Sequence, residues 1–134
     1  MSTWPPHVSA IVVDTSVWID FFSGRDTGRL DEALRLGVVL VPPIVVAELL
    51  SGVRPPDRDV LASFLRDLEL DASSLDHWMA VGDLRAACKR RGVSVSTPDA
   101  HVAQCALDRD ALLLSHDAVF TRIAQLIPLR VARG

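Results

Sequence analysis

Short apolar runs recur along the chain, and between them lie segments in which apolar residues recur every three or four positions. Residues 10–13, 38–41 and 111–114 are continuous runs of Ala, Val, Ile and Leu. Such runs are typical of central strands that are covered on both faces. Residues 68–70 and 129–132 are weaker candidates, the latter for an edge strand. The pattern therefore predicts a sheet of four or five strands.

Helix signals fill the intervals between these strands. Asp14 directly follows the first apolar run and is suited to cap a helix that ends at Ser23 and Gly24. Thr97, Pro98 and Asp99 form another helix start, with a cap, a proline at the first position and then an acid. The predicted helices cover approximately residues 15–22, 28–36, 44–50, 57–67, 75–91, 97–108 and 118–123.

Strands that alternate with helices define an α/β fold with a mainly parallel sheet and helices on both faces. The 134 residues, of which 49% are apolar, suit one domain over residues 1–134 and leave little room for a second. In such doubly wound folds, ligands bind at the carboxyl ends of the strands, near the reversal in strand order. The search for a site therefore begins at these strand ends.

Four acidic residues occupy such positions. Asp14 follows the first strand directly, and Asp117 follows the strand at 111–114 after two residues. Asp99 lies in the first turn of a helix, just after an extended segment at 93–95, and Glu48 interrupts an otherwise apolar helix. We expect the three aspartates to gather at one edge of the sheet and to form a site together with Glu48.

Each acid also has a purely structural interpretation. Asp caps helices, an acid in the first turn suits the helix dipole, and Glu48 would then simply face solvent. Considered together, the acids favour a metal site, because clustered carboxylates repel one another and need a compensating cation or raised pKa values. Oxygen-only ligands select Mg²⁺ or Mn²⁺. Such a site is best suited to the hydrolysis of phosphodiester bonds.

Four segments resemble, in order, the motifs of PIN-domain nucleases, and together they cover almost the whole chain. They are Asp14-Thr-Ser-Val-Trp-Ile-Asp20, Pro43-Ile-Val-Val-Ala-Glu48-Leu49, Thr97-Pro-Asp99-Ala-His-Val-Ala103 and Leu113-Leu-Ser-His-Asp117-Ala-Val-Phe120. With its small size, the chain is most similar to the VapC-type toxins of bacterial toxin–antitoxin pairs.

This resemblance implies a PIN-like three-layer αβα domain that hydrolyses RNA internally, commonly tRNA or rRNA, with Mg²⁺ or Mn²⁺ as cofactor. Asp14, Glu48, Asp99 and Asp117 would be the metal-binding and catalytic acids. Ser16 would help to hold a metal-site water or a phosphate. The resemblance further implies a homodimer that is neutralised by a cognate antitoxin, whose C-terminal segment covers the site.

The overall charge and the ends of the chain add little to this picture. The net charge of −3 does not indicate a nucleic-acid-binding protein, although it is compatible with a basic rim around an acidic site. Met1 to Ser9 lack the pattern of a secretory signal, and no apolar run reaches membrane-spanning length. We expect a cytoplasmic protein without a membrane partner.

The histidines and cysteines offer no obvious site. Cys88 and Cys105 both lie in predicted helices and are expected to be buried thiols. No Cys-x-x-Cys pair or Cys/His cluster occurs along the chain, so a structural zinc site is not expected. His116 is interpreted as a turn residue, His101 as part of a helix surface, and His77 has no informative context.

Two other classes of function compete with the nuclease. A haloacid-dehalogenase-like phosphatase or a phospho-receiver domain needs a lysine near a later strand end, whereas Lys89, the single lysine, lies in a predicted helix. The phosphatase also needs a second Asp where Ser16 stands. A non-catalytic partner-binding domain on the same doubly wound fold stays open, because a fold alone does not prove an activity.

Overall fold

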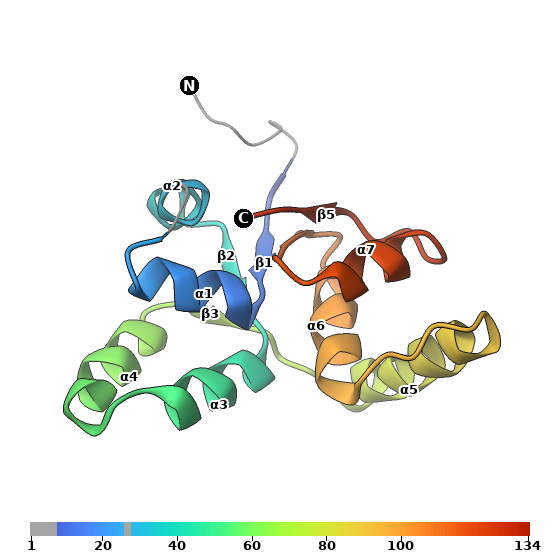
Figure 1. The fold of residues 1–134 in the computed structure, drawn as a ribbon, viewed down its shortest axis with the longest axis horizontal. Coiled ribbons are helices and arrows are strands. Elements are labelled where there is room, and N and C mark those ends of the chain that lie inside the picture. Colours follow the sequence, from blue (N-terminus) through green and yellow to red (C-terminus); the bar gives the residue numbers. More distant parts are fainter. Residues whose placement is uncertain (1–7, 26–27) are drawn as a thin grey trace.

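The computed structural model describes residues 8–25 and 28–134, so the N-terminal end at Met1 to His7 lies outside the described residues. Five strands form one sheet in the order β3-β2-β1-β4-β5, and every neighbouring pair is parallel (Figure 1). The strands are β1 (Ile11–Val13), β2 (Val39–Val41), β3 (Glu69–Leu70), β4 (Leu112–Leu114) and β5 (Val131–Ala132). The predicted α/β class is confirmed, and the sheet is parallel throughout.

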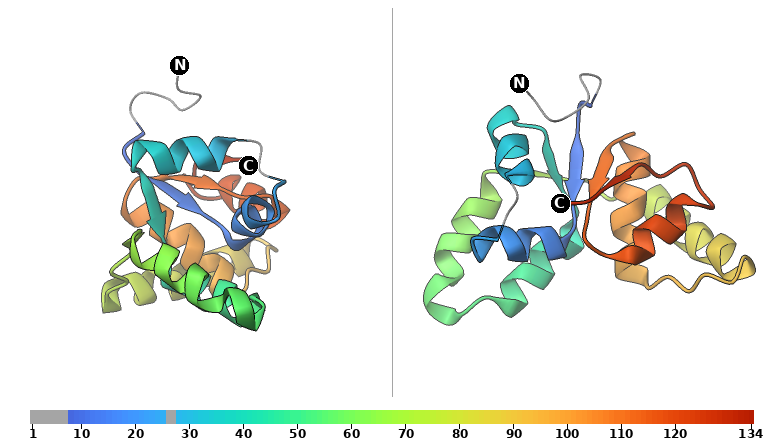
Figure 2. Two further views of the ribbon diagram at one scale, coloured as in Figure 1. Left: turned by 90° about the vertical axis from the view of Figure 1, so that its left-hand side faces the viewer. Right: turned by 45° about the horizontal axis from the view of Figure 1, so that its top comes forward.

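Helices cover both faces of this sheet. They are α1 (Thr15–Phe22), α2 (Arg29–Leu36), α3 (Pro43–Gly52), α4 (Arg58–Arg66), α5 (Leu75–Arg90), α6 (Thr97–Asp108) and α7 (Ala118–Ala124), with a short 3₁₀ helix at Pro55–Asp57. Right-handed crossovers place the helices that precede β3 on one face and the later ones on the other. Accordingly, α1 to α4 lie on one side of β1, and α5 to α7 on the other (Figures 1 and 2).

The core is centred on β1 and on α6, which packs against it. All three residues of β1 are fully buried, as expected for a central strand in a parallel sheet. Along α6, the consecutive residues 100–103 are all buried, because β1 and β4 lie on one side of this helix and α5 lies on the other. Trp18 on α1 fills the opposite face and packs its ring against Phe64 of α4.

The segment at 93–95, which was expected only to be extended, pairs with no described strand and belongs to the loop between α5 and α6. One detail differs from the sequence-based expectation. The cap of α6 is Ser96 rather than Thr97, because the Ser96 hydroxyl accepts the backbone N–H of Asp99. No helix within residues 8–25 and 28–134 is long and apolar enough to span a membrane.

Candidate active site

Asp14 lies where the direction of strand order reverses. From β1 the chain moves outward to β2 and β3, whereas from β4 it moves to β5 on the other side. The N–H of Asp14 donates to the carbonyl of Leu114 at 3.0 Å, which joins the carboxyl ends of the two adjacent strands. Asp14 is only 8% exposed. Its carboxylate therefore occupies the position at which doubly wound folds bind ligands.

Two hydroxyl groups orient the carboxylate of Asp14. Ser16 Oγ at 3.1 Å and Ser115 Oγ at 2.9 Å both donate to the same oxygen, Oδ2. Ser16 Oγ also accepts the N–H of His116 at 3.2 Å, and Ser115 Oγ accepts the N–H of Asp117 at 3.0 Å. These bonds tie the turn after β4 to the start of α1, so that Asp14 and Asp117 are held in one hydrogen-bonded unit.

Asp117 and Glu48 are each fixed through one carboxylate oxygen. Asp117 caps α7, and its Oδ1 accepts the N–H of Val119 at 3.0 Å. Glu48, exposed on α3, accepts the hydroxyl of Thr15 on Oε1 at 2.8 Å. Within the described parts of the chain, no group donates to Oδ1 of Asp14, Oδ2 of Asp117 or Oε2 of Glu48. Each of these carboxylates is thus held by one oxygen and has the second available to a ligand.

Asp99, in the first turn of α6, completes the group. Partial burial raises the pKa of its carboxyl, the hydrogen bond with Ser96 opposes this, and the negative charges of Asp117, Asp14 and Glu48 raise it further. These three contributions mean that the four carboxylates lie within electrostatic reach of one another. The structure therefore brings together all four acids that the sequence predicted, and it places Ser16 against Asp14.

The donor set of this cluster fits a hard divalent cation. All of its donors are oxygens, and the ion pairs formed by residues 8–25 and 28–134 include none of the four acids. Among the described residues, no cationic side chain forms an ion pair with these acids that would offset their mutual repulsion. Mg²⁺ and Mn²⁺ prefer this kind of ligand set, and Mg²⁺ commonly binds through a few carboxylates with water and substrate phosphate as the other ligands.

Of the hydroxyl groups that support the acids, the sequence indicated Ser16 but not Ser115 or Thr15. Ser115 is 2% exposed and follows β4 just as Asp14 follows β1, so its position after a strand was an available signal. Thr15 had no comparable signal, because Glu48 is 33 residues away along the chain. His116 lies in a bend, as predicted, and its Nε2 is 3.0 Å from Oδ2 of Asp20, an acid of the first motif.

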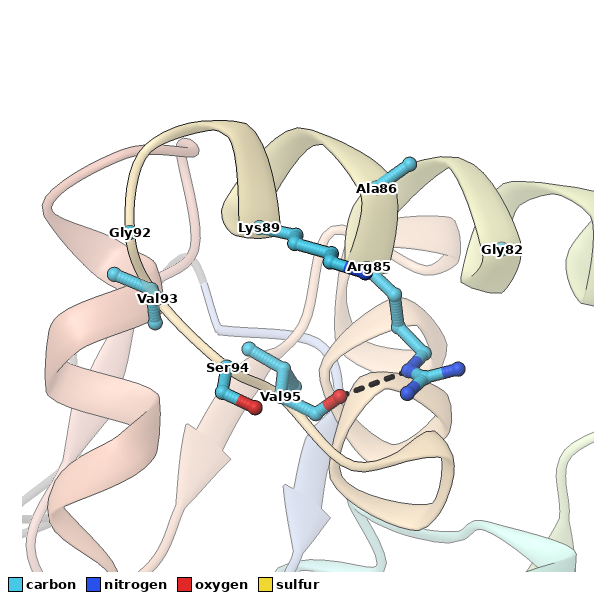
Figure 3. A pocket seen from close by; sticks show the side chains of 8 residues that line it. All are labelled: Gly82, Arg85, Ala86, Lys89, Gly92, Val93, Ser94 and Val95. Carbon is cyan, nitrogen blue, oxygen red and sulfur yellow. Dashed lines mark hydrogen bonds between the residues drawn. The ribbon is translucent and has the colours of Figure 1, made fainter.

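A pocket of about 540 Å³ lies apart from the acids, between the end of α5 and the loop at 92–95 (Figure 3). Its basic residues are Arg85 and Lys89. Figure 3 shows the guanidinium of Arg85 turned toward the loop, where its Nε donates to the carbonyl of Val95 at 2.8 Å. Arg85 thereby braces the segment that leads into α6. We interpret this pocket as part of the support for Asp99.

The fold and the site define a class of protein: a doubly wound α/β domain with a cluster of four carboxylates at the switch in strand order. The model of the PIN domain family matches residues 11–126, so the chain belongs to the PIN-domain family. The resemblance of the four motifs to this family is thereby confirmed.

Named relatives and solved structures agree with this assignment. A VapC ribonuclease of Mycobacterium bovis and ribonuclease VapC11 of Mycobacterium tuberculosis are each 31% identical to the chain over 137 residues, which cover 91% of the chain and 97% of the relative. VapBC2 from Rickettsia felis, bound to a promoter DNA fragment, aligns with a TM-score of 0.76 at 18% identity, over 93% of this chain and 98% of that one. DNA-bound VapBC from Salmonella typhimurium aligns with a TM-score of 0.76 at 20% identity, over 92% and 97%. At these identities the two structures establish the shared fold.

Proposed function

We propose that this chain is a Mg²⁺- or Mn²⁺-dependent endoribonuclease that acts as the toxin of a toxin–antitoxin pair, with tRNA or rRNA as substrate. The observation that carries the proposal is the set of four carboxylates at the strand switch, none of which forms an ion pair with a cationic side chain in the part of the chain that the structure describes. The names of the related VapC ribonucleases support nuclease activity and RNA, rather than DNA, as the substrate.

The roles of the side chains follow from their hydrogen bonds. Asp14, Glu48, Asp99 and Asp117 would hold the cation, and Ser16 and Ser115 would keep the carboxylate of Asp14 oriented toward it. Thr15 would do the same for Glu48. A divalent ion in such a site supplies an acidified water and stabilises the charge on the leaving oxygen.

Cleavage of RNA by the purified protein tests the nuclease directly. A mixture of total tRNA and rRNA is incubated with Mg²⁺, with Mn²⁺ and with EDTA, beside Asp14→Asn and the surface control Asp83→Asn. We expect discrete fragments that require the metal, vanish in Asp14→Asn and persist in Asp83→Asn. Absence of both cleavage and Mn²⁺ binding in the folded protein would instead favour the partner-binding domain. Cleavage that continues in EDTA would contradict the metal requirement.

An apolar groove beside the acids is suited to the antitoxin. It has a volume of about 530 Å³, and Glu48 lies in its wall. The other lining residues are mostly apolar and come from α1, α3 and α4, with Ile19, Phe22 and Val60 exposed. A peptide that fills this groove reaches Glu48 and is therefore placed to cover the site. The VapBC titles of the structural relatives support a partner of this kind.

The role as a toxin is tested in cells. Induced expression without an antitoxin should arrest growth because uncontrolled RNA cleavage stops translation, whereas Asp14→Asn should be tolerated. Equal toxicity of the two forms would show that growth arrest does not depend on the acidic site.

We also propose a homodimer. The exposed apolar residues Leu75, Trp78 and Met79 of α5 form a suitable contact face, since their spacing places them on one side of the helix.

A further inference from the structure

A second polar cluster, separate from the four acids, is buried between α5, α6 and the turn after β3. His77 belongs to α5, His101 and Cys105 belong to α6, and Asp71 follows β3; all four are buried. The interpretation of His101 as a surface residue is therefore wrong, and His77, whose sequence context was uninformative, is buried beside it. The missing signal was spatial, because His77 and His101 are 24 residues apart in sequence.

The ligand atoms of this cluster converge on one point. His77 Nε2 lies 2.7 Å from His101 Nδ1, and Cys105 Sγ lies 3.9 Å from that same nitrogen. The three ligand atoms are all within 4.8 Å of one another. Asp71 Oδ2 is 3.5 Å from Cys105 Sγ and supplies a fourth donor group next to them. Two imidazoles, a thiol and a carboxylate thus meet in the interior of the domain.

Hydrogen bonds hold the cluster in place when both imidazoles are neutral. Asp108 accepts the Nδ1–H of His77 at 2.5 Å, and His77 Nε2 accepts the Nδ1–H of His101. Oδ2 of Asp71 accepts the backbone N–H of Ser73 at 3.0 Å and its hydroxyl at 2.7 Å. The thiol of Cys105 lies 3.5 Å from the same oxygen and 3.9 Å from Nε2 of His101. Neutral imidazoles and a deprotonated thiol are the forms of these groups that bind a metal ion.

We propose that His77, His101, Cys105 and Asp71 form a zinc site that fastens α5 to α6. Nitrogen and sulfur ligands select Zn²⁺ over Mg²⁺, which distinguishes this cluster from the acidic one. His77 coordinates through Nε2 while its Nδ1–H donates to Asp108, the arrangement in which a carboxylate orients a metal-binding histidine. His101 coordinates through Nδ1 once its ring proton has moved from Nδ1 to Nε2, through exchange with solvent. Cys105 releases its thiol proton to solvent, and its thiolate and the Asp71 carboxylate neutralise the two charges of the ion.

Zinc binding requires the ligand atoms to move: those of His77, His101 and Cys105 lie within 4.8 Å of one another, and the Asp71 carboxylate, which accepts hydrogen bonds from Ser73, must turn toward them. Zinc bonds nitrogen at about 2.0–2.1 Å and sulfur at about 2.3 Å, so tetrahedral ligand atoms lie roughly 3.3–3.6 Å apart. His77 Nε2 and His101 Nδ1 must separate from 2.7 Å, and Cys105 Sγ must approach from 3.9 Å. Trp78 stacks on the His101 ring at a centroid distance of 4.5 Å and limits the direction of this movement.

Cobalt, a spectroscopic substitute for zinc, tests the proposal without any measurement of cleavage. Because the cluster is buried, the full chain is unfolded and then refolded with one equivalent of Co²⁺. We expect one tetrahedral Co²⁺ per chain with a thiolate-to-cobalt charge-transfer band, which Zn²⁺ removes by displacement. The band should vanish in Cys105→Ser, and binding should weaken at least tenfold in His77→Gln.

Two controls assign the site. Cys88→Ser replaces the other buried thiol and should keep the band. Asp99→Asn weakens the acidic site and should also keep it. A refolded native chain that shows no thiolate band at excess Co²⁺ overturns the proposal and leaves the cluster as a hydrogen-bonded network. A charge-transfer band that is lost in Cys88→Ser, or that persists in Cys105→Ser, also overturns the proposal.

Discussion

The negative charge of Asp99 is unfavourable for folding, although the proposed cation site requires it. An acid whose pKa is raised in the folded state stabilises the fold only while it is protonated, and this stabilisation is lost as the pH rises through the raised value. At neutral pH and without metal, the ionised carboxylate is therefore unfavourable beside Asp14, Glu48 and Asp117. Its place in the first turn of α6 offsets part of this cost through the helix dipole.

We predict that Asp99→Asn leaves the metal-free protein equally stable or more stable and abolishes RNA cleavage. Urea unfolding in EDTA measures the stability, and a second series in Mg²⁺ should show any advantage of the variant shrinking, because the ion removes the repulsion. Asp83→Asn, on the exposed face of α5, is the control and should change neither property. A marked loss of metal-free stability together with retained cleavage would contradict the acidic-cluster model.

Ser115 allows a second test, in which a single hydroxyl group is removed. Its hydroxyl orients Asp14 from a buried position without itself being a carboxylate ligand. Loss of such a supporting group typically costs about 10–100-fold in metal affinity or activity. We predict that Ser115→Ala needs a correspondingly higher Mn²⁺ concentration for half-maximal cleavage, whereas Ser63→Ala, on the exposed face of α4, does not. Identical Mn²⁺ dependence of the two variants would show that Ser115 has no such role.

At the scale of single residues, the sequence indicated the acids that lie at or just after strand ends but missed Ser115, which directly follows β4. Asp14 and Asp117 were identifiable because the ends of parallel strands converge, whatever the details of packing. His101 was misplaced because a polar residue in a helix normally indicates a solvent face. The helix α6 has hardly any such face over residues 100–103, since the sheet and α5 enclose it.

Local signals in the sequence predicted the helices and strands closely, but they did not predict which segments pair in the sheet. Proline at the first turn and serine or aspartate caps located the starts of α3, α6 and α7 to within a residue or two. Residues 93–95 carry the β-branched composition of a strand yet stay outside the sheet. Between α5 and α6 they have no neighbouring strand to pair with, a fact that only the tertiary structure contains.

A comparison of two helix caps distinguishes the effect of a cap on the stability of the protein from its effect on cleavage. Ser74 caps α5 and Ser96 caps α6, each by accepting a backbone N–H. We predict that Ser74→Ala and Ser96→Ala each lower the free energy of unfolding by about 1 kcal/mol. Only Ser96→Ala should also slow cleavage, because the first turn of α6 carries Asp99. Thermal unfolding and RNA cleavage are measured for both variants. Equal cleavage rates would show that the cap of α6 does not affect the active site.

For the molecule as a whole, the sequence predicted the layers but not the order of strands. The hydrogen bond from Ser115 to Asp14 spans 101 residues, and it forms because β4 inserts beside β1 rather than beside β3. No local pattern specifies that insertion. It results from the long return of the chain through α5 and α6 across the other face of the sheet, and this crossover both creates the strand switch and brings Asp99 to it.

The same architecture places two exposed apolar surfaces on opposite sides of β1, and we predict that they bind different partners. Val60, which is 76% exposed, lines the groove next to Glu48, whereas Met79, which is 60% exposed, lies on α5.

An arginine at either position places a charge in an apolar contact and should weaken it strongly, with little effect on the fold because both side chains face solvent. Val60→Arg should therefore lose inhibition by the co-expressed antitoxin and remain a dimer, whereas Met79→Arg should become monomeric and remain inhibited. Light scattering after size exclusion and growth of cells that express both proteins give the two readouts. If one substitution abolished both interactions, the two surfaces would form a single interface, and the assignment of separate partners would be wrong.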